Sequence, residues 1–301
     1  MFFLSCHGAK EKKQVNKNEI MDTQPSPNPV TQNPIKMKAK QIYQLSHYWD
    51  KFNFADSLDN TQSGFTEQAF VNYITLFPSV PLNEVQNSID SFMDRAKTRK
   101  KTFVFFENLF DKYLYNPNSP LRNDLFYEPV LRYLLKSDMI NDTERIRYQI
   151  QLRVLQKNKP GSKAKSFSYW LGRGKLGCLA EIEAPFTLLI FYEPGCSACE
   201  QLISQVKASL SINDLINKKI LKVLAIYPEG NEEIWKGYQT NIPANWINGL
   251  DREQHVLKGR IYDLKASPTI YLLDENKIVL LKDVDFLQVG KFFESLNNRG
   301  N

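Results

Sequence analysis

The chain has 301 residues, of which 42% are hydrophobic and 24% are charged, a balance typical of globular proteins with room for two domains. The formal net charge is +6, and residues 8–40, with seven Lys and three acidic residues, hold most of it. Because the rest of the chain is nearly neutral, the charge does not indicate a nucleic-acid partner.

The four cysteines are too few for a disulfide scaffold in a chain of this length. They are Cys6, Cys178, Cys196 and Cys199. The sequence contains no run of eighteen apolar residues, so we expect no transmembrane helix in the chain as given.

The first six residues, MFFLSC, look like the end of a signal sequence. Leu4, Ser5 and Cys6 resemble the lipobox of bacterial lipoproteins, in which the cysteine is lipidated after cleavage. We therefore expect translation to start upstream of Met1, a lipid anchor at Cys6 as the one attachment to a membrane, and a periplasmic or outer-membrane lipoprotein of the bacterial cell envelope. The alternative is an incidental cysteine behind five ordinary residues.

Residues 8–40 are polar, contain four prolines and have few large apolar side chains. Such a segment buries too little surface to offset the entropy lost on ordering, so we predict a disordered tether. Residues 1–40 thus form a leader and tether, outside the folded domains.

Between residues 41 and 158, apolar and aromatic side chains recur at helical spacing. This pattern predicts an all-α bundle of about five helices, one capped by Thr66 and the last capped by Asp142. The stretch contains no catalytic constellation. Its aromatic side chains fit a packed core, with a peptide-binding surface as the alternative.

Residues 158–163 (NKPGSK) have turn composition and mark a boundary, after which the hydrophobic period changes. We predict a β-hairpin over 166–179, strands at 187–192, 221–227 and 246–247, and a second hairpin over 269–281. Helices are predicted at 200–217, 231–240, 252–262 and 286–296. Alternating strands and helices followed by a hairpin indicate an α/β domain with a mixed central sheet, covering 163–298. The predicted fold class is therefore a two-domain chain, all-α and then α/β.

The most chemically specific stretch is LLIFYEPGCSACEQL, residues 188–202. It is a buried strand, a Pro-Gly break, and then Cys196 and Cys199 at the start of a helical pattern. A helix N-terminus favours the thiolate, so Cys196 is the candidate nucleophile for a substrate disulfide. Cys199 would then resolve the mixed disulfide. Glu193 is a candidate proton acceptor for Cys199, with an exposed carboxylate of no catalytic role as the alternative.

Other chemistries fit this stretch less well. Zinc needs four ligands, but there is no second cysteine pair and the nearest downstream histidine is His255, so no metal or cofactor is predicted. A thiol peroxidase of the peroxiredoxin type would have Thr or Ser where Glu193 stands. Cys178 falls in a predicted strand and is expected to be a buried small apolar residue.

Far along the chain, Ala266-Ser267-Pro268-Thr269 leads directly into the strand TIYLLD. A proline there can simply be the first residue of a strand. However, the segments FYEPGCSACEQL, KVLAIYP and ASPTIYLLD, in this order and spacing, resemble the thioredoxin superfamily, and specifically envelope thiol-disulfide oxidoreductases similar to TlpA and ResA. The resemblance covers about residues 163–298. The helical half resembles a domain of unknown function, DUF5106, that precedes such modules in Bacteroidetes lipoproteins.

The resemblance implies that Pro268 is cis and lies against the dithiol, and that Ser267 and Gly195 belong to the substrate-binding surface. It also implies a protein disulfide as substrate and an upstream thiol as electron donor. Two positions depart from the superfamily pattern: Gly195 replaces the usual Trp, and the central strand lacks its buried acid.

These observations predict a thiol-disulfide oxidoreductase that reduces or isomerises protein disulfides. Because Ser197 and Ala198 carry no positive charge, we expect a reductase-like or moderate potential. The alternative, suggested by the two departures, is a non-catalytic binding protein in which the helical domain holds a partner.

Overall fold

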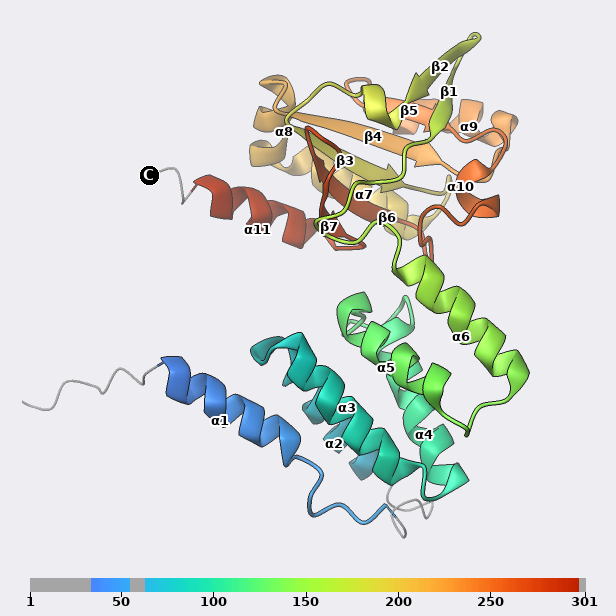
Figure 1. Ribbon diagram of the computed structural model, residues 1–301. Helices are drawn as coiled ribbons and strands as arrows, with labels where there is room; N and C mark the ends of the chain where they lie inside the picture. The colour runs from blue at the N-terminus through green and yellow to red at the C-terminus, as the bar shows by residue number, and fades with distance from the viewer. Residues whose placement is uncertain (1–33, 55–62, 298–301) are drawn as a thin grey trace, which may run out of the picture.

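The computed structural model describes residues 34–54 and 63–297 and divides them into a helical domain and an α/β domain (Figure 1). The helical domain lies against two parts of the α/β domain, the loop formed by residues 259–268 and strand β7 (Val279–Lys282). This arrangement is the fold class that the sequence predicts. Cys6 and most of the predicted tether lie outside the described residues.

The helical domain is built around a core of aromatic side chains. Near its centre, the ring of Phe92 lies 4.9 Å from that of Trp49 and 4.7 Å from that of Phe106. The predicted aromatic stripes therefore pack inward. The helices are α1 (Pro34–Ser46), α2 (Ser63–Ile74), α3 (Leu82–Ala96), α4 (Lys100–Phe110), α5 (Asp124–Lys136) and α6 (Asp142–Leu155), and a π-helical turn (Asp111–Tyr115) extends α4.

The structure corrects three predictions for this domain: the disorder of residues 34–40 and the N-caps at Thr66 and Asp142. The described residues contain six α-helices, and α1 begins at Pro34, inside the segment predicted to be disordered up to residue 40. The first half of α1 is exposed and Lys-rich, and only further on does Leu45 reach the core, so composition gave no helical signal. Thr66 is a buried residue inside α2, not its N-cap.

The cap of α6 is also one residue earlier than predicted. Asn141 is the N-cap, and its side chain accepts a hydrogen bond from the Glu144 backbone N–H at 2.9 Å. The Glu144 carboxylate in turn accepts from the Asn141 N–H at 2.8 Å. This is a capping box, and Asp142 is the first helical residue within it.

The α/β domain contains a seven-stranded mixed sheet with strand order β2-β1-β5-β4-β3-β6-β7. Strands β3, β4 and β5 are parallel, and β1, β2, β6 and β7 add antiparallel pairs at the two sides. Their bounds are β1 (Ser168–Gly172), β2 (Lys175–Cys178), β3 (Phe186–Phe191), β4 (Leu221–Tyr227), β5 (Ile247–Leu250), β6 (Thr269–Asp274) and β7 (Val279–Lys282). Both predicted hairpins form.

Strand β3 is buried on both faces, which explains its continuous apolar run. Leu188 and Ile190 belong to the core under α7 (Ser197–Ala208), α8 (Leu210–Asn217), α9 (Glu232–Tyr238) and α11 (Phe286–Asn297). Leu189 and Phe191 point to the opposite face, where the core includes Val256 of α10 (His255–Lys258). The strand that leads to the cysteines is therefore held from both sides.

Two predicted helices of this domain are shorter than expected. The helix predicted at 200–217 is broken at Ser209, which has an extended backbone and whose hydroxyl caps α8 by accepting from the Ile212 N–H. The helix predicted at 252–262 is only α10, because Gln254 and Arg260 on either side of it have positive φ values of 59° and 45°.

The segment between the domains is fixed to the α/β domain. The Gly161 N–H donates to the Val279 carbonyl at 2.8 Å, and the Val279 N–H donates to the Ser162 carbonyl at 2.9 Å. The buried side chain of Asn158 donates to the Ile261 carbonyl and accepts from the Lys165 N–H. The turn residues thus extend the sheet beside β7.

Candidate active site

The two cysteines lie where β3 ends and α7 begins. Cys196 is the N-cap residue of α7, and Cys199 is in its first turn. Cys196 is half-buried, whereas Cys199 is 0% exposed and packs into the core under the sheet. An incoming group can therefore reach Cys196 but not Cys199.

The environment of Cys199 favours a neutral thiol. Burial raises the pKa of Cys199 to about 12, against the opposing effect of the Glu193 backbone N–H, which donates to its Sγ at 3.5 Å. The neighbouring Cys196 and the Glu193 carboxylate also raise this pKa. The two cysteines, three residues apart, thus differ in their accessibility to an incoming group.

Pro268 comes to the dithiol from far along the chain. The Ser267–Pro268 peptide bond is cis, as the resemblance implied, and the Cys196 thiol donates to the Ser267 carbonyl oxygen at 3.5 Å. The two segments meet because β3 and β6 are neighbours, with Phe191 paired to Thr269. The backbone before Pro268 therefore lies directly against the exposed cysteine.

Gly195 and Glu193 line the turn before Cys196, and both are exposed. Gly195 has φ +79°, and a Cβ built on it would meet no atom within 4 Å. The backbone conformation thus favours glycine at this position, where the thioredoxin superfamily usually has Trp. The apolar surface that a Trp side chain would provide beside Cys196 is absent. The backbone N–H of Glu193 contacts the Cys199 Sγ, and the Glu193 carboxylate adds a small contribution that raises the pKa of this thiol.

Sequence reasoning missed the aromatic group beneath the dithiol. The rings of Tyr192 and Tyr238 stack at 5.9 Å and share a core cluster with Cys199. Asn248 accepts hydrogen bonds from the Tyr192 hydroxyl at 2.9 Å and from Trp235 Nε1 at 3.2 Å. These residues come from β5, α9 and the end of β3, and no local motif links them.

Cys178 is not the buried residue that was expected. It is half-buried in β2, the edge strand of the sheet, and its Sγ lies 3.2 Å from the Ser166 hydroxyl. Within the described ranges 34–54 and 63–297, no three His, Cys, Asp or Glu side chains gather as they would around a metal ion. No helix in that part of the chain is long and apolar enough to cross a membrane.

Comparison with known proteins agrees with this geometry. The family model described as Domain of unknown function (DUF5106) matches residues 5–158, just over half of the chain. The crystal structure of a thioredoxin-like protein from Bacteroides caccae is 37% identical and has a TM-score of 0.82, with 91% of this chain and 98% of that chain covered. No curated protein matches.

Two further solved structures are similar to just under half of the chain. The C-terminal domain of an uncharacterized protein from Bacteroides fragilis is 43% identical, with 45% of this chain and 96% of that chain covered and a TM-score of 0.44. A domain of a possible thiol-disulfide isomerase from Cytophaga hutchinsonii is 21% identical, with 48% and 97% covered and a TM-score of 0.41.

The fold and the arrangement of dithiol and cis-proline define a thioredoxin-like protein. More specifically, the chain belongs to the DUF5106 family, with the DUF5106 domain preceding the thioredoxin-like domain.

Proposed function

We propose that the protein is a thiol-disulfide oxidoreductase that reduces or isomerises disulfides of protein substrates. The observation that carries this proposal is the asymmetric pair: an accessible Cys196 at a helix N-terminus and a fully buried Cys199 one turn behind it. An attacking thiolate must be reachable, while a resolving thiol needs only to reach its neighbour.

In the proposed reaction, the Cys196 thiolate attacks one sulfur of the substrate disulfide. A Cys196–substrate disulfide forms and the other substrate sulfur leaves as a thiolate. Cys199 then loses its proton and attacks the Cys196 sulfur, which forms the Cys196–Cys199 disulfide and releases the second substrate thiol. A thiol donor of the cell envelope returns the pair to the dithiol.

The second step needs a proton acceptor, because burial keeps Cys199 protonated. Glu193 is the candidate, since its backbone N–H contacts the Cys199 Sγ at 3.5 Å, its carboxylate raises the pKa of Cys199, and strand β3 offers no acid. Pro268 and the Ser267 carbonyl would hold the substrate backbone beside Cys196, and the open surface at Gly195 would leave room for bulky protein substrates.

Reduction of insulin disulfides tests this function. The wild type is expected to turn over insulin, and Cys196→Ser to lose this activity, because Cys199 is fully buried and Cys178 lies in the edge strand β2, away from the cis-proline loop. Cys199→Ser should accumulate mixed disulfides with substrates. A wild type with both thiols free and no exchange activity would refute the proposal, and partners captured unchanged by a Cys196→Ser, Cys199→Ser double variant would support the binding-protein alternative.

We further propose that the protein is a lipoprotein anchored in the cell envelope through Cys6. The support is the sequence Leu4-Ser5-Cys6 followed by a polar segment. Labelled palmitate should be incorporated into the full chain expressed from its natural start and not into Cys6→Ser; equal incorporation into both would contradict the anchor.

A further inference from the structure

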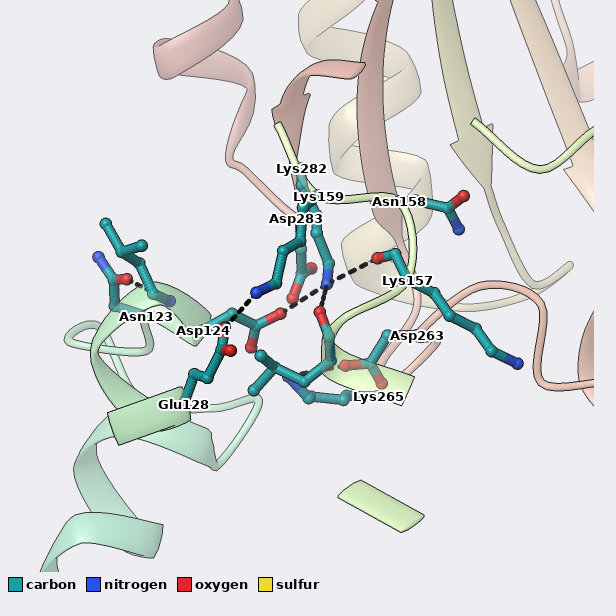
Figure 2. Close-up of polar contacts among 12 residues, drawn as sticks. Asn123, Asp124, Glu128, Lys157, Asn158, Lys159, Asp263, Lys265, Lys282 and Asp283 are labelled. Carbon is teal, nitrogen blue, oxygen red and sulfur yellow. Dashed lines mark hydrogen bonds and ion pairs between the residues drawn. The ribbon is translucent and has the colours of Figure 1, made fainter. Parts of the chain in front are cut away.

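A cluster of charged side chains joins the helical domain to the loop that precedes Pro268 (Figure 2). Asp124, the first residue of α5, accepts a hydrogen bond from Lys265 Nζ at 2.5 Å and forms an ion pair with Lys282 Nζ at 3.0 Å. Lys265 also lies 3.0 Å from Asp263. The helical domain thus holds the loop through a side chain 141 residues away in sequence.

This cluster is withdrawn from solvent. The side chains of Lys265 and Lys282 are each 5% exposed and that of Asp124 is 17% exposed. Burial disfavours the ammonium of Lys265, but Asp124 and Asp263 outweigh it and raise the pKa of Lys265. Removing one partner of such a pair leaves a buried charge uncompensated, so the geometry is held firmly.

Lys265 is also fixed from a second direction. Its ammonium lies 4.6 Å from the ring centre of Tyr115, at the end of the π-helical turn of the helical domain. Asp124 and the Tyr115 ring, which both contact Lys265, therefore come from the helical domain, whereas Asp263 comes from the loop itself.

The loop runs from this cluster directly to the dithiol. Ser267 is two residues beyond Lys265, and its carbonyl oxygen is the group 3.5 Å from Cys196 Sγ. The Thr269 hydroxyl donates to the Ala266 carbonyl at 2.6 Å and tightens the turn between them. This carbonyl is in contact with the reactive sulfur, so a shift of the loop alters what surrounds Cys196.

A cavity of about 340 Å³ lies at the same junction, lined by Arg122, Asp124, Lys282 and Asp283 among others. Its charges are paired with each other: Arg122 binds Asp283 at 2.8 Å, and Lys282 binds Asp124. The charged side chains at this junction therefore hold the two domains together and are not free to bind a ligand.

We propose that Lys265, held by Asp124 of the helical domain, is a positioning residue that sets the Ser267 carbonyl against the Cys196 thiol. The helical domain thereby takes part in the redox site without touching substrate. The expected change in insulin reduction rests on the proposed function. The expected change in the reactivity of the Cys196 thiol does not.

The test uses the reduced full chain and compares Asp124→Asn, Lys265→Met and the control Glu128→Gln. Glu128 lies one turn further along α5 and pairs with Lys159 of the linker, so it belongs to the same interface without contacting the loop before Pro268. The rate of Cys196 alkylation by iodoacetamide, assigned by tandem mass spectrometry, is measured together with KM and kcat for insulin.

The Ser267 carbonyl holds the Cys196 thiol in a hydrogen bond and covers one side of its Sγ, so loosening the loop should free the sulfur and speed alkylation. We expect an increase of about fivefold in Asp124→Asn and Lys265→Met, with KM raised by a similar factor and kcat little changed. Glu128→Gln should leave all three close to the wild type. Because one variant alters the helix and the other alters the loop, loss of the fold in one still leaves a decisive variant.

Alkylation rates in a folded Asp124→Asn or Lys265→Met variant that equal the wild-type rate would overturn the inference. So would an equal change in Glu128→Gln, which would indicate general loosening of the interface. If the wild type does not reduce insulin but Cys196 alkylation is faster in the two variants, only the proposed function is refuted. If the wild type reduces insulin but the two variants alkylate at the wild-type rate, only this inference is refuted.

Discussion

Cys196 and Cys199 differ because of where the backbone places them, not because of their immediate neighbours in sequence. The turn before α7 leaves Cys196 at the surface, and the first helical turn directs Cys199 into the core beside Tyr192 and Tyr238. The spacing of three residues was predictable from the sequence. The strength of the burial, and the raised pKa of Cys199 that follows from it, depends on aromatic residues contributed by distant elements.

Gly195 offers a test at the residue scale. Its φ of +79° disfavours any side chain, so Gly195→Ala should lower the free energy of unfolding by about 1 kcal/mol or more. Gly237 in α9 also has open space where a Cβ would lie but no positive φ, so Gly237→Ala should raise it by about 0.5–1 kcal/mol. Urea unfolding measures both; the same sign for the two variants would contradict the assigned conformation.

At the scale of elements, buried strands were the easiest to predict. Strand β4 has the bounds expected from its apolar run, because a parallel strand between two others is apolar on both faces. Helix ends were harder. The carboxylate of Asp251 accepts from the N–H groups of His255 and Val256 and starts α10 there, an interaction that periodicity does not reveal.

The cap of α6 gives a test at this scale. Asn141→Ala should cost about 1 kcal/mol of the free energy of unfolding, because the Glu144 backbone N–H loses the side-chain acceptor that caps the helix. Asp142→Ala should cost only about 0.3–0.5 kcal/mol, since it removes a favourable charge at the helix N-terminus and no capping hydrogen bond. Denaturant titrations compare them, and a larger loss for Asp142→Ala would restore the cap predicted from sequence.

At the scale of the whole molecule, the domains are joined by contacts that no local pattern announces. The segment 158–163 was predicted as a boundary from its turn residues, yet it pairs with β7, and Asp124 and Lys265 meet across the interface. Two-domain architecture, the dithiol and Pro268 were all accessible to sequence reasoning. The coupling between helical domain and active site was not, because charged residues on separate elements carry no shared spacing.

Lys282 tests the strength of this junction. Its ammonium donates to the Leu155 carbonyl at 2.7 Å and the Lys157 carbonyl at 3.2 Å, at the end of α6, and pairs with Asp124. Lys282→Met should therefore lower the free energy of unfolding by about 3 kcal/mol. The exposed pair of Lys218 with Asp214 provides a control, Lys218→Met, with an expected change within about 0.5 kcal/mol. Thermal and urea unfolding measure both variants, and an equal loss in the free energy of unfolding for the two would contradict a strong contribution of Lys282 to this junction.

We expect Cys196 and Cys199 to form a reversible redox pair, which a redox titration can detect. The full chain is equilibrated in glutathione buffers of graded potential at pH 7, quenched with a thiol-blocking reagent and analysed by mass spectrometry, with Cys178 as internal reference. We expect one two-electron transition to a Cys196–Cys199 disulfide, with a midpoint at or below about −200 mV, while Cys178 stays unpaired. A dithiol that persists across the whole range, or oxidation that joins Cys178 instead, would contradict it.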